Sequence, residues 1–128
     1  SGGANAIGFF GFAYYVENKA KLKVVPIDGG KGAITPNHDT ITDGTYAPFS
    51  RPLFIYVNKK SADRSEVAGF INFYIDNASE LAEEVGYVKL PAEVISRAKA
   101  NFAAKKTGTQ FTDAKGEKVS GSIVKVYQ

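Results

Sequence analysis

The segment that most constrains the fold is residues 46–60, which read YAPFSRPLFIYVNKK. At its centre, residues 53–57 form an unbroken apolar run rich in β-branched and aromatic side chains, which is typical of a strand covered on both faces. Because proline cannot donate a hydrogen bond to a ladder, Pro48 and Pro52 belong to the approach or to the strand's first residue. The sequence therefore predicts a stiff extended connection that enters the middle of a sheet, as in chains that pass between two lobes.

The composition is that of an ordinary globular chain. Its 128 residues are 44% hydrophobic and 23% charged, which suits one core of normal size and argues against disorder. The absence of cysteine excludes disulfides, thiolate metal sites and cysteine nucleophiles. No apolar stretch approaches the roughly 18 residues that span a bilayer, and no signal-peptide pattern is visible.

The start of the sequence is unusual, because an apolar run begins close to it and no methionine occurs anywhere. Residues 6–12 read AIGFFGF, whereas natural domain ends are usually polar and frayed. We therefore expect the chain to be a piece of a longer protein.

Apolar periodicity and turn signals predict alternating strands and helices. Thr35 is expected to cap a short helix, Asp63 and Glu66 to form a capping box, Asn77 to mark a break, and Gly86 to end the long helix. Strands are predicted at 6–10, 22–27, 53–57 and 122–127, and helices at 12–21, about 35–43, 63–86 and 91–107. This order predicts an α/β fold with a thin sheet whose edges need partners.

A search for catalytic or metal-binding groups yields no site. The single histidine, His38, lies in a polar turn and is expected to be exposed and structural. Glu80, Glu83 and Glu84 fall on the polar side of a predicted helix, where charge is usually solvated. No cluster of ligands suits a metal and no nucleophile–base pair can be assembled, so we expect no enzyme, no metal and no cofactor.

Three glycine-containing stretches resemble anion-binding loops only superficially. Residues 29–32 read GGKG but fail the Walker pattern, so a turn is favoured. Residues 1–3 precede a predicted strand, whereas phosphate-binding glycines follow one. Residues 120–122 suit a hairpin or a loop. None of these stretches therefore predicts a phosphate site.

The C-terminal quarter of the sequence is basic. Residues 97–128 contain seven Lys or Arg and two acidic residues, so their net charge is seven minus two, or +5. Such a tail attracts nucleic acid or an anionic surface. The lysines are spaced apart and lack interleaved aromatic residues for stacking, so a solvated positive face is the favoured interpretation.

Two long blocks and one short element carry a resemblance to a known family. The blocks are residues 5–30 (NAIGFFGFAYYVENKAKLKVVPIDGG) and 45–77 (TYAPFSRPLFIYVNKKSADRSEVAGFINFYIDN), and the element is residues 83–91 (EEVGYVKLP). In order and length they resemble the C-terminal half of the bacterial phosphate-binding proteins of the Pst ABC transporter. The resemblance covers about residues 4 to 104, and the tail from about residue 107 matches less clearly.

The resemblance implies part of a two-lobed, type 2 periplasmic-binding-protein fold. Residues 1–48 would finish the second lobe, and residues 49–128 would provide the interlobe crossing and the C-terminal part of the first lobe. Ser50, Arg51 and Pro52 would lie at the crossing or hinge. Arg51 is tempting as an anion clamp, but its match is to the crossing block, so a structural or hinge role is favoured.

The resemblance also implies a function. The whole protein would capture inorganic phosphate for an ABC importer by hinge closure, in the periplasm or another extracytoplasmic space, with a lipid anchor as one option. The family's phosphate ligands have no counterpart here, so no ligand-binding residue is expected in this chain. Expected partners are the transporter's membrane subunits and a complementary N-terminal chain or an oligomer, but not nucleic acid. The alternatives are a phosphate sensor or scavenger on the same scaffold, or a basic nucleic-acid-binding module with steeply salt-dependent binding.

Overall fold

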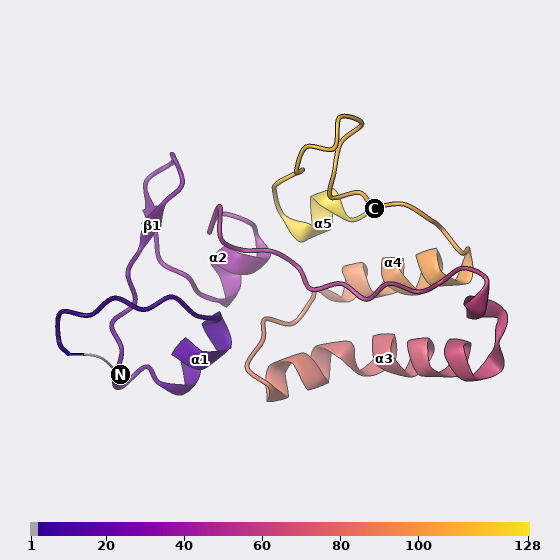
Figure 1. The fold of residues 1–128 in the computed structure, drawn as a ribbon, viewed down its shortest axis with the longest axis horizontal. Helices are drawn as coiled ribbons and strands as arrows, with labels where there is room; N and C mark the ends of the chain where they lie inside the picture. The colour runs from indigo at the N-terminus through magenta and orange to yellow at the C-terminus, as the bar shows by residue number, and fades with distance from the viewer. Residues whose placement is uncertain (1–2) are drawn as a thin grey trace.

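The computed structural model describes residues 3–128 and has two parts joined by an extended segment (Figure 1). The N-terminal part contains α1 (Phe12–Glu17), β1 (Ile27–Asp28), β2 (Ala33–Ile34) and α2 (His38–Thr42). The second part contains η1 (Ser61–Asp63), α3 (Ser65–Glu84), α4 (Ala92–Ala103) and α5 (Ile123–Val126). Ser1 and Gly2 lie outside the described residues, so the structure does not test the expectation that residues 1–3 form no phosphate-binding loop.

The N-terminal part is built around a short hairpin. Strands β1 and β2 are antiparallel, with Ile27 opposite Ile34. The Asp28 carboxylate accepts hydrogen bonds from the backbone N–H groups of Gly30 and Gly32 at 2.8 and 3.1 Å, which fixes the turn. The predicted turn at residues 29–32 is therefore confirmed. The predicted strand at 6–10 is wrong and that at 22–27 is wrong in extent, because Ile27 is the only residue of these two described segments that pairs in a ladder.

Helix α2 begins two residues later than the sequence predicts. Asn37 is the N-cap, and its side chain and that of Thr40 form a reciprocal capping box at 2.9 and 3.0 Å. The predicted cap, Thr35, instead accepts a hydrogen bond from the Thr40 hydroxyl through its carbonyl oxygen. The end of the helix agrees with the prediction, because Asp43 is the C-cap and Gly44 follows with a φ of +78°.

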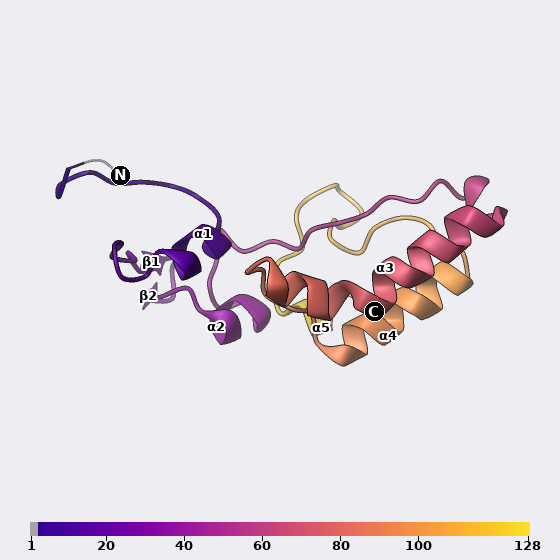
Figure 2. The same cartoon turned by 90° about the horizontal axis from the view of Figure 1, so that it is seen from below.

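The second part is a pair of helices, α3 and α4, that lie side by side (Figures 1 and 2). Ile71 and Ile75 of α3 and Val94 of α4 are the buried apolar residues of the described chain. Ile71 and Ile75 are four residues apart and therefore lie on the same face of α3, which faces α4. The core therefore lies between these two helices, while much of the apolar face predicted for α3 remains uncovered.

For α3, two sequence predictions are wrong and one is confirmed. Asp63 and Glu66 do not form a capping box, because Arg64 is the N-cap and no side chain caps the helix. Asn77 does not break the helix, since its amide donates to the carbonyl of Phe73 at 2.7 Å within one continuous α3. Gly86 follows the C-cap with a φ of +75°, as predicted for a helix-terminating glycine.

The C-terminal tail folds as a turn and a short helix. The predicted strand at residues 122–127 is wrong, because Ser122 accepts backbone hydrogen bonds from Lys125 and Val126 and starts α5. A short apolar run does not distinguish a strand from a helix by its pattern alone. Before α5, an isolated bridge between Thr112 and Lys118 closes a hairpin-like turn.

The fold class is only partly that of the expected α/β protein. Most of the regular structure in the described residues is helical. The sheet within these residues is the two-stranded ladder of β1 and β2. No helix among residues 3–128 has the length and apolar character needed to cross a membrane. The structure contains the predicted helices, but the described residues do not form the larger sheet that the apolar pattern predicts.

Candidate functional site

The candidate site is the extended connection between the two parts, here called the crossing and defined as residues 45–57. Its entry is tied to α2, because the Tyr46 amide donates to the Thr40 carbonyl at 2.8 Å. The Ser50 hydroxyl donates to the Tyr46 carbonyl at 2.6 Å. These bonds fold the first residues of the crossing back on themselves, and the chain then runs out along the helix pair (Figure 2).

A local cap fixes the residues just before the crossing. The Asp43 carboxylate accepts hydrogen bonds from the Thr45 amide at 2.8 Å and the Thr45 hydroxyl at 2.6 Å. The hydroxyl bond, and then the amide bond, hold the pKa of Asp43 below its usual range, because both stabilise the charged carboxylate. The crossing therefore leaves α2 in a defined direction.

The three residues predicted to form the hinge lie together in the middle of the crossing. Ser50 and Pro52 are half-buried, whereas Arg51 is exposed. Within residues 3–128, Arg51 forms no hydrogen bond or ion pair. The structure thus places Ser50, Arg51 and Pro52 in the segment that joins the two parts, and their hinge role stays a prediction.

Residues 53–57 are extended but unpaired, contrary to the predicted buried strand. Leu53 is 74% exposed and Tyr56 is 91% exposed. No backbone hydrogen bond of residues 51–57 is formed within the part of the chain that the structure describes. These features make residues 53–57 an open strand: its exposed apolar side chains are unfavourable in water, and its unpaired N–H and C=O groups are free to pair with another strand.

A large concave surface lies beside this open strand. It is open to solvent, has a volume of about 2280 Å³, and is lined mostly by apolar residues of the N-terminal part, the crossing, α3, α4 and the tail. Small-molecule pockets typically enclose about 300–1,000 Å³ and place a few polar groups around the ligand. The concavity therefore has the size of a polypeptide packing surface and not that of a site for a small anion.

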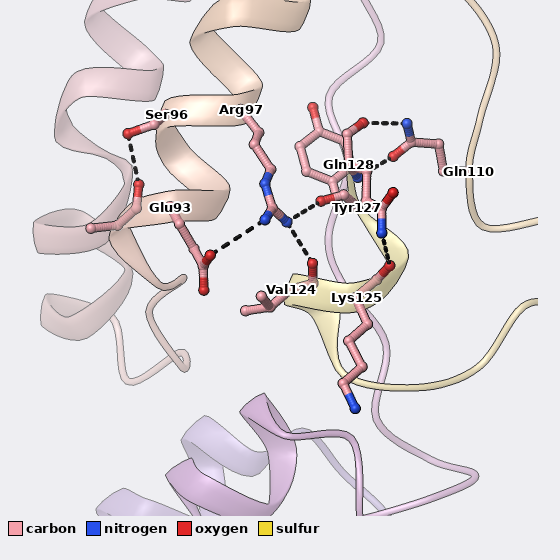
Figure 3. A network of polar contacts seen from close by, with 9 residues as sticks. Glu93, Ser96, Arg97, Gln110, Val124, Lys125, Tyr127 and Gln128 are labelled. Carbon is pink, nitrogen blue, oxygen red and sulfur yellow. Dashed lines mark hydrogen bonds and ion pairs between the residues drawn. The ribbon is translucent and has the colours of Figure 1, made fainter.

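The C-terminal tail is held against α4 by Arg97 (Figure 3). Its guanidinium donates hydrogen bonds to the carbonyl oxygens of Val124 and Tyr127, the latter at 2.8 Å, and pairs with Glu93 at 3.3 Å. Sequence reasoning counted Arg97 only as part of the basic excess. No local motif identifies it, because its partners are backbone atoms 27 and 30 residues away.

The other candidate residues form no reaction centre. His38 is exposed and lies edge-on to the Phe12 ring, with centroids 5.6 Å apart. Glu83 pairs with Lys89 at 2.9 Å on the surface. Among residues 3–128, no three His, Cys, Asp or Glu side chains are grouped to hold a metal ion.

Several basic residues of the C-terminal quarter are already paired. Lys99 pairs with Asp76, and Lys105 pairs with Asp63. The Lys106 ammonium donates to the backbone carbonyl of Gln128 at 3.0 Å. The two ion pairs neutralise part of the positive charge, which favours the solvated-face interpretation over a nucleic-acid groove.

Comparisons with curated proteins identify similar chains. Protein SphX of Synechococcus elongatus (strain ATCC 33912 / PCC 7942 / FACHB-805) is 47% identical over 118 residues, which cover 91% of this chain and 34% of that protein. Phosphate-binding protein PstS of Staphylococcus aureus (strain USA300) is 48% identical over 87 residues, covering 66% of this chain and 26% of that protein. The chain thus spans at most about a third of these relatives.

A solved structure supports the same relationship. The crystal structure of a possible phosphate binding protein from Planctomyces limnophilus DSM 3776 matches with a TM-score of 0.65 and 42% identity, over 77% of this chain and 36% of that one. No protein-family model matches the chain. The predicted resemblance is confirmed: the chain is similar to one part of the bacterial phosphate-binding proteins and is consistent with a C-terminal PstS-like portion.

Proposed function

We propose that this chain contributes to a solute-binding protein that captures inorganic phosphate and delivers it to an ABC importer. The observation that carries the proposal is the 48% identity to a phosphate-binding protein over 66% of the chain. A solved chain with 42% identity is also described as a possible phosphate binding protein. Both are binding proteins by description.

Two lobes are part of the proposal. Residues 1–48 would complete the second lobe, and residues 49–128 would contain the crossing and the C-terminal part of the first lobe. The extended path between the two parts in Figure 1 supports this division. Phosphate would bridge the lobes, and closure would bend the chain near Ser50, Arg51 and Pro52, in a hinge motion.

The open strand at residues 53–57 supports a further part of the proposal. Its unpaired backbone and exposed Leu53 and Tyr56 would be covered by strands supplied by the rest of the protein. Because the chain spans at most about a third of its named relatives, sufficient polypeptide is available in such proteins to form those strands. A complementary chain or an oligomer would serve the same purpose.

The phosphate ligands would come mainly from outside this chain. Phosphate sites use hydroxyl groups, helix N-termini and arginine side chains that converge on one point. The exposed Arg51 stands apart from such a group in the described residues. The protein would act outside the cytoplasm, where an importer's binding protein meets its solute.

Isothermal titration calorimetry of the full-length protein that carries this sequence tests the proposal. Inorganic phosphate should bind with saturable heat, whereas sulfate serves as a control anion of similar shape. Absence of phosphate binding would refute the function. A pull-down with the membrane subunits of a phosphate importer then separates transport from sensing or scavenging, since only transport requires that complex.

A further inference from the structure

The C-terminal segment, residues 110–128, contacts Gly44 just before the crossing and Phe54 near the exit end of the crossing. On the entry side, Gly44 ends α2 with a φ of +78°. A β-carbon at this position would lie 2.6 Å from the carbonyl carbon and oxygen of Gly121 and 2.8 Å from the Ser122 nitrogen. The two backbones therefore meet directly, with no room for a side chain between them.

On the exit side, the contact is aromatic. The Phe54 ring packs edge-to-face on Phe111, with centroids 4.8 Å apart. Phe111 in turn stacks on Tyr127, with centroids 6.2 Å apart. Edge-to-face and offset-stacked rings are favoured arrangements, so the open strand is attached to the tail by Phe54 even though its backbone is unpaired.

The tail is itself fixed to α4. Arg97 donates to the carbonyls of Val124 and Tyr127, as Figure 3 shows. The Gln128 amide donates to the Gln110 side-chain oxygen at 2.6 Å, which joins the two ends of the segment. Figure 1 shows the tail and α5 beside the crossing, near both α2 and α4. The segment is thus attached both to α4 and to Phe54.

We propose that residues 110–128 act as a brace that limits movement at the crossing. The brace is anchored to the first-lobe side by Arg97 and the aromatic cluster, and it abuts the second-lobe side at Gly44. The Gly44 contact involves backbone only, so it can separate without unpacking a core. Rotation of one lobe against the other in one sense would press Gly44 on Gly121, and rotation in the opposite sense would part them.

This inference rests on the proposed function, because the brace limits a hinge only if the two parts belong to two lobes. What it adds to the proposed function is that the tail, residues 110–128, restrains the movement of the crossing. That restraint is measurable without phosphate, whereas the function is decided by phosphate binding to the unmodified protein. Failure of one is therefore distinguishable from failure of the other.

Amide hydrogen exchange of the full-length, phosphate-free protein tests the brace with the variant Phe111→Ala. Removal of the ring should free the crossing, so exchange at residues 45–57 should rise about fivefold or more while α3 changes less than about twofold. Phe70→Ala is the matched control, because this exposed ring of α3 lies beside Tyr74 of the same helix and belongs to no aromatic pair with the tail in the described residues. The control should leave residues 45–57 unchanged.

Two results would overturn the brace. One is an unchanged exchange rate at residues 45–57 in Phe111→Ala. The other is an equal rise throughout α3, α4 and the crossing, which would show general packing instead of a specific coupling. A milder variant, Phe111→Leu, keeps apolar contact if Phe111→Ala fails to fold, and it should raise exchange at residues 45–57 by about twofold; no rise would also count against the brace.

Discussion

Arg97 of α4 donates a hydrogen bond of 2.8 Å to the carbonyl oxygen of Tyr127 near the C-terminal end of the chain. The same guanidinium nitrogen also contacts the Val124 carbonyl, so one side chain satisfies two backbone acceptors at the end of α5. Helix C-termini carry unpaired carbonyls and a partial negative charge. A cation at this position therefore stabilises α5 and holds the tail on α4.

Replacement of Arg97 by Met should detach the tail. Hydrogen bonds to charged groups contribute about 1.5–3 kcal/mol each, and we expect Arg97→Met to lower the free energy of unfolding of the full-length protein by about 2 kcal/mol. Denaturant unfolding measures this change. Arg64→Met is the control, because the Arg64–Glu66 pair is exposed and such pairs contribute about 0–1 kcal/mol. Equal losses in the two variants would contradict the role of Arg97.

The open strand should be protected in the full-length protein. If other strands cover residues 53–57, their amides should exchange at least about 100-fold more slowly than those of the turn at residues 114–116, whose residues are exposed. Hydrogen exchange with mass spectrometry measures both segments in one sample. Comparable exchange of the two segments would show that the strand stays uncovered, and the two-lobe proposal would then lose its main structural support.

The Asp43–Thr45 cap gives a pH-dependent prediction. The hydrogen bonds from Thr45 lower the pKa of Asp43 in the folded protein. Its contribution to stability is therefore present above the unfolded pKa and is lost as the pH falls through the lower, folded pKa. A carboxyl-detected NMR titration should place Asp43 below the usual range. Thr45→Val removes the hydroxyl donor and should raise the value, whereas Thr42→Val on the same helix should not.

The helical part of the fold could be predicted from the sequence because its signals are local. The 3.6-residue apolar period, Pro91 and Gly86 predict α3 and α4, and both helices are present, although α3 is unbroken at Asn77 and α4 ends at Ala103, before the predicted end near residue 107. Strands depend on partners distant in sequence, and the apolar run at 53–57 finds none among the described residues. The same nonlocal dependence explains why residues 122–127 form a helix and not the predicted strand.

The candidate site was predictable only in part. The prolines and the apolar run identify the crossing, and the family resemblance places Ser50, Arg51 and Pro52 within it. The tail contacts were not predictable, because Gly44 and Gly121 meet through backbone atoms. Such contacts leave no periodic pattern in the sequence. A glycine with a positive φ is a weak signal of close approach, and it becomes informative only once its neighbour is known.

Gly86 and Gly69 provide a matched pair of glycine substitutions with opposite expected outcomes. Gly86 has a φ of +75°, and a β-carbon there would lie 3.2 Å from the Ala13 β-carbon of α1. Gly69 lies inside α3, and a β-carbon there meets nothing within 4 Å. Gly86 is required because its φ is positive and because Ala13 leaves little room for a side chain. Glycine at position 69 has no such role and only weakens the helix.

Gly86→Ala should therefore destabilise the full-length protein by about 1–2 kcal/mol, since alanine is strained at positive φ. Gly69→Ala should stabilise it by about 0.5–1 kcal/mol, because alanine loses less backbone entropy in a helix. Thermal and denaturant unfolding measure both. A neutral Gly86→Ala would contradict this prediction, because it would show that the full-length protein keeps neither the positive φ at Gly86 nor the close approach of Ala13.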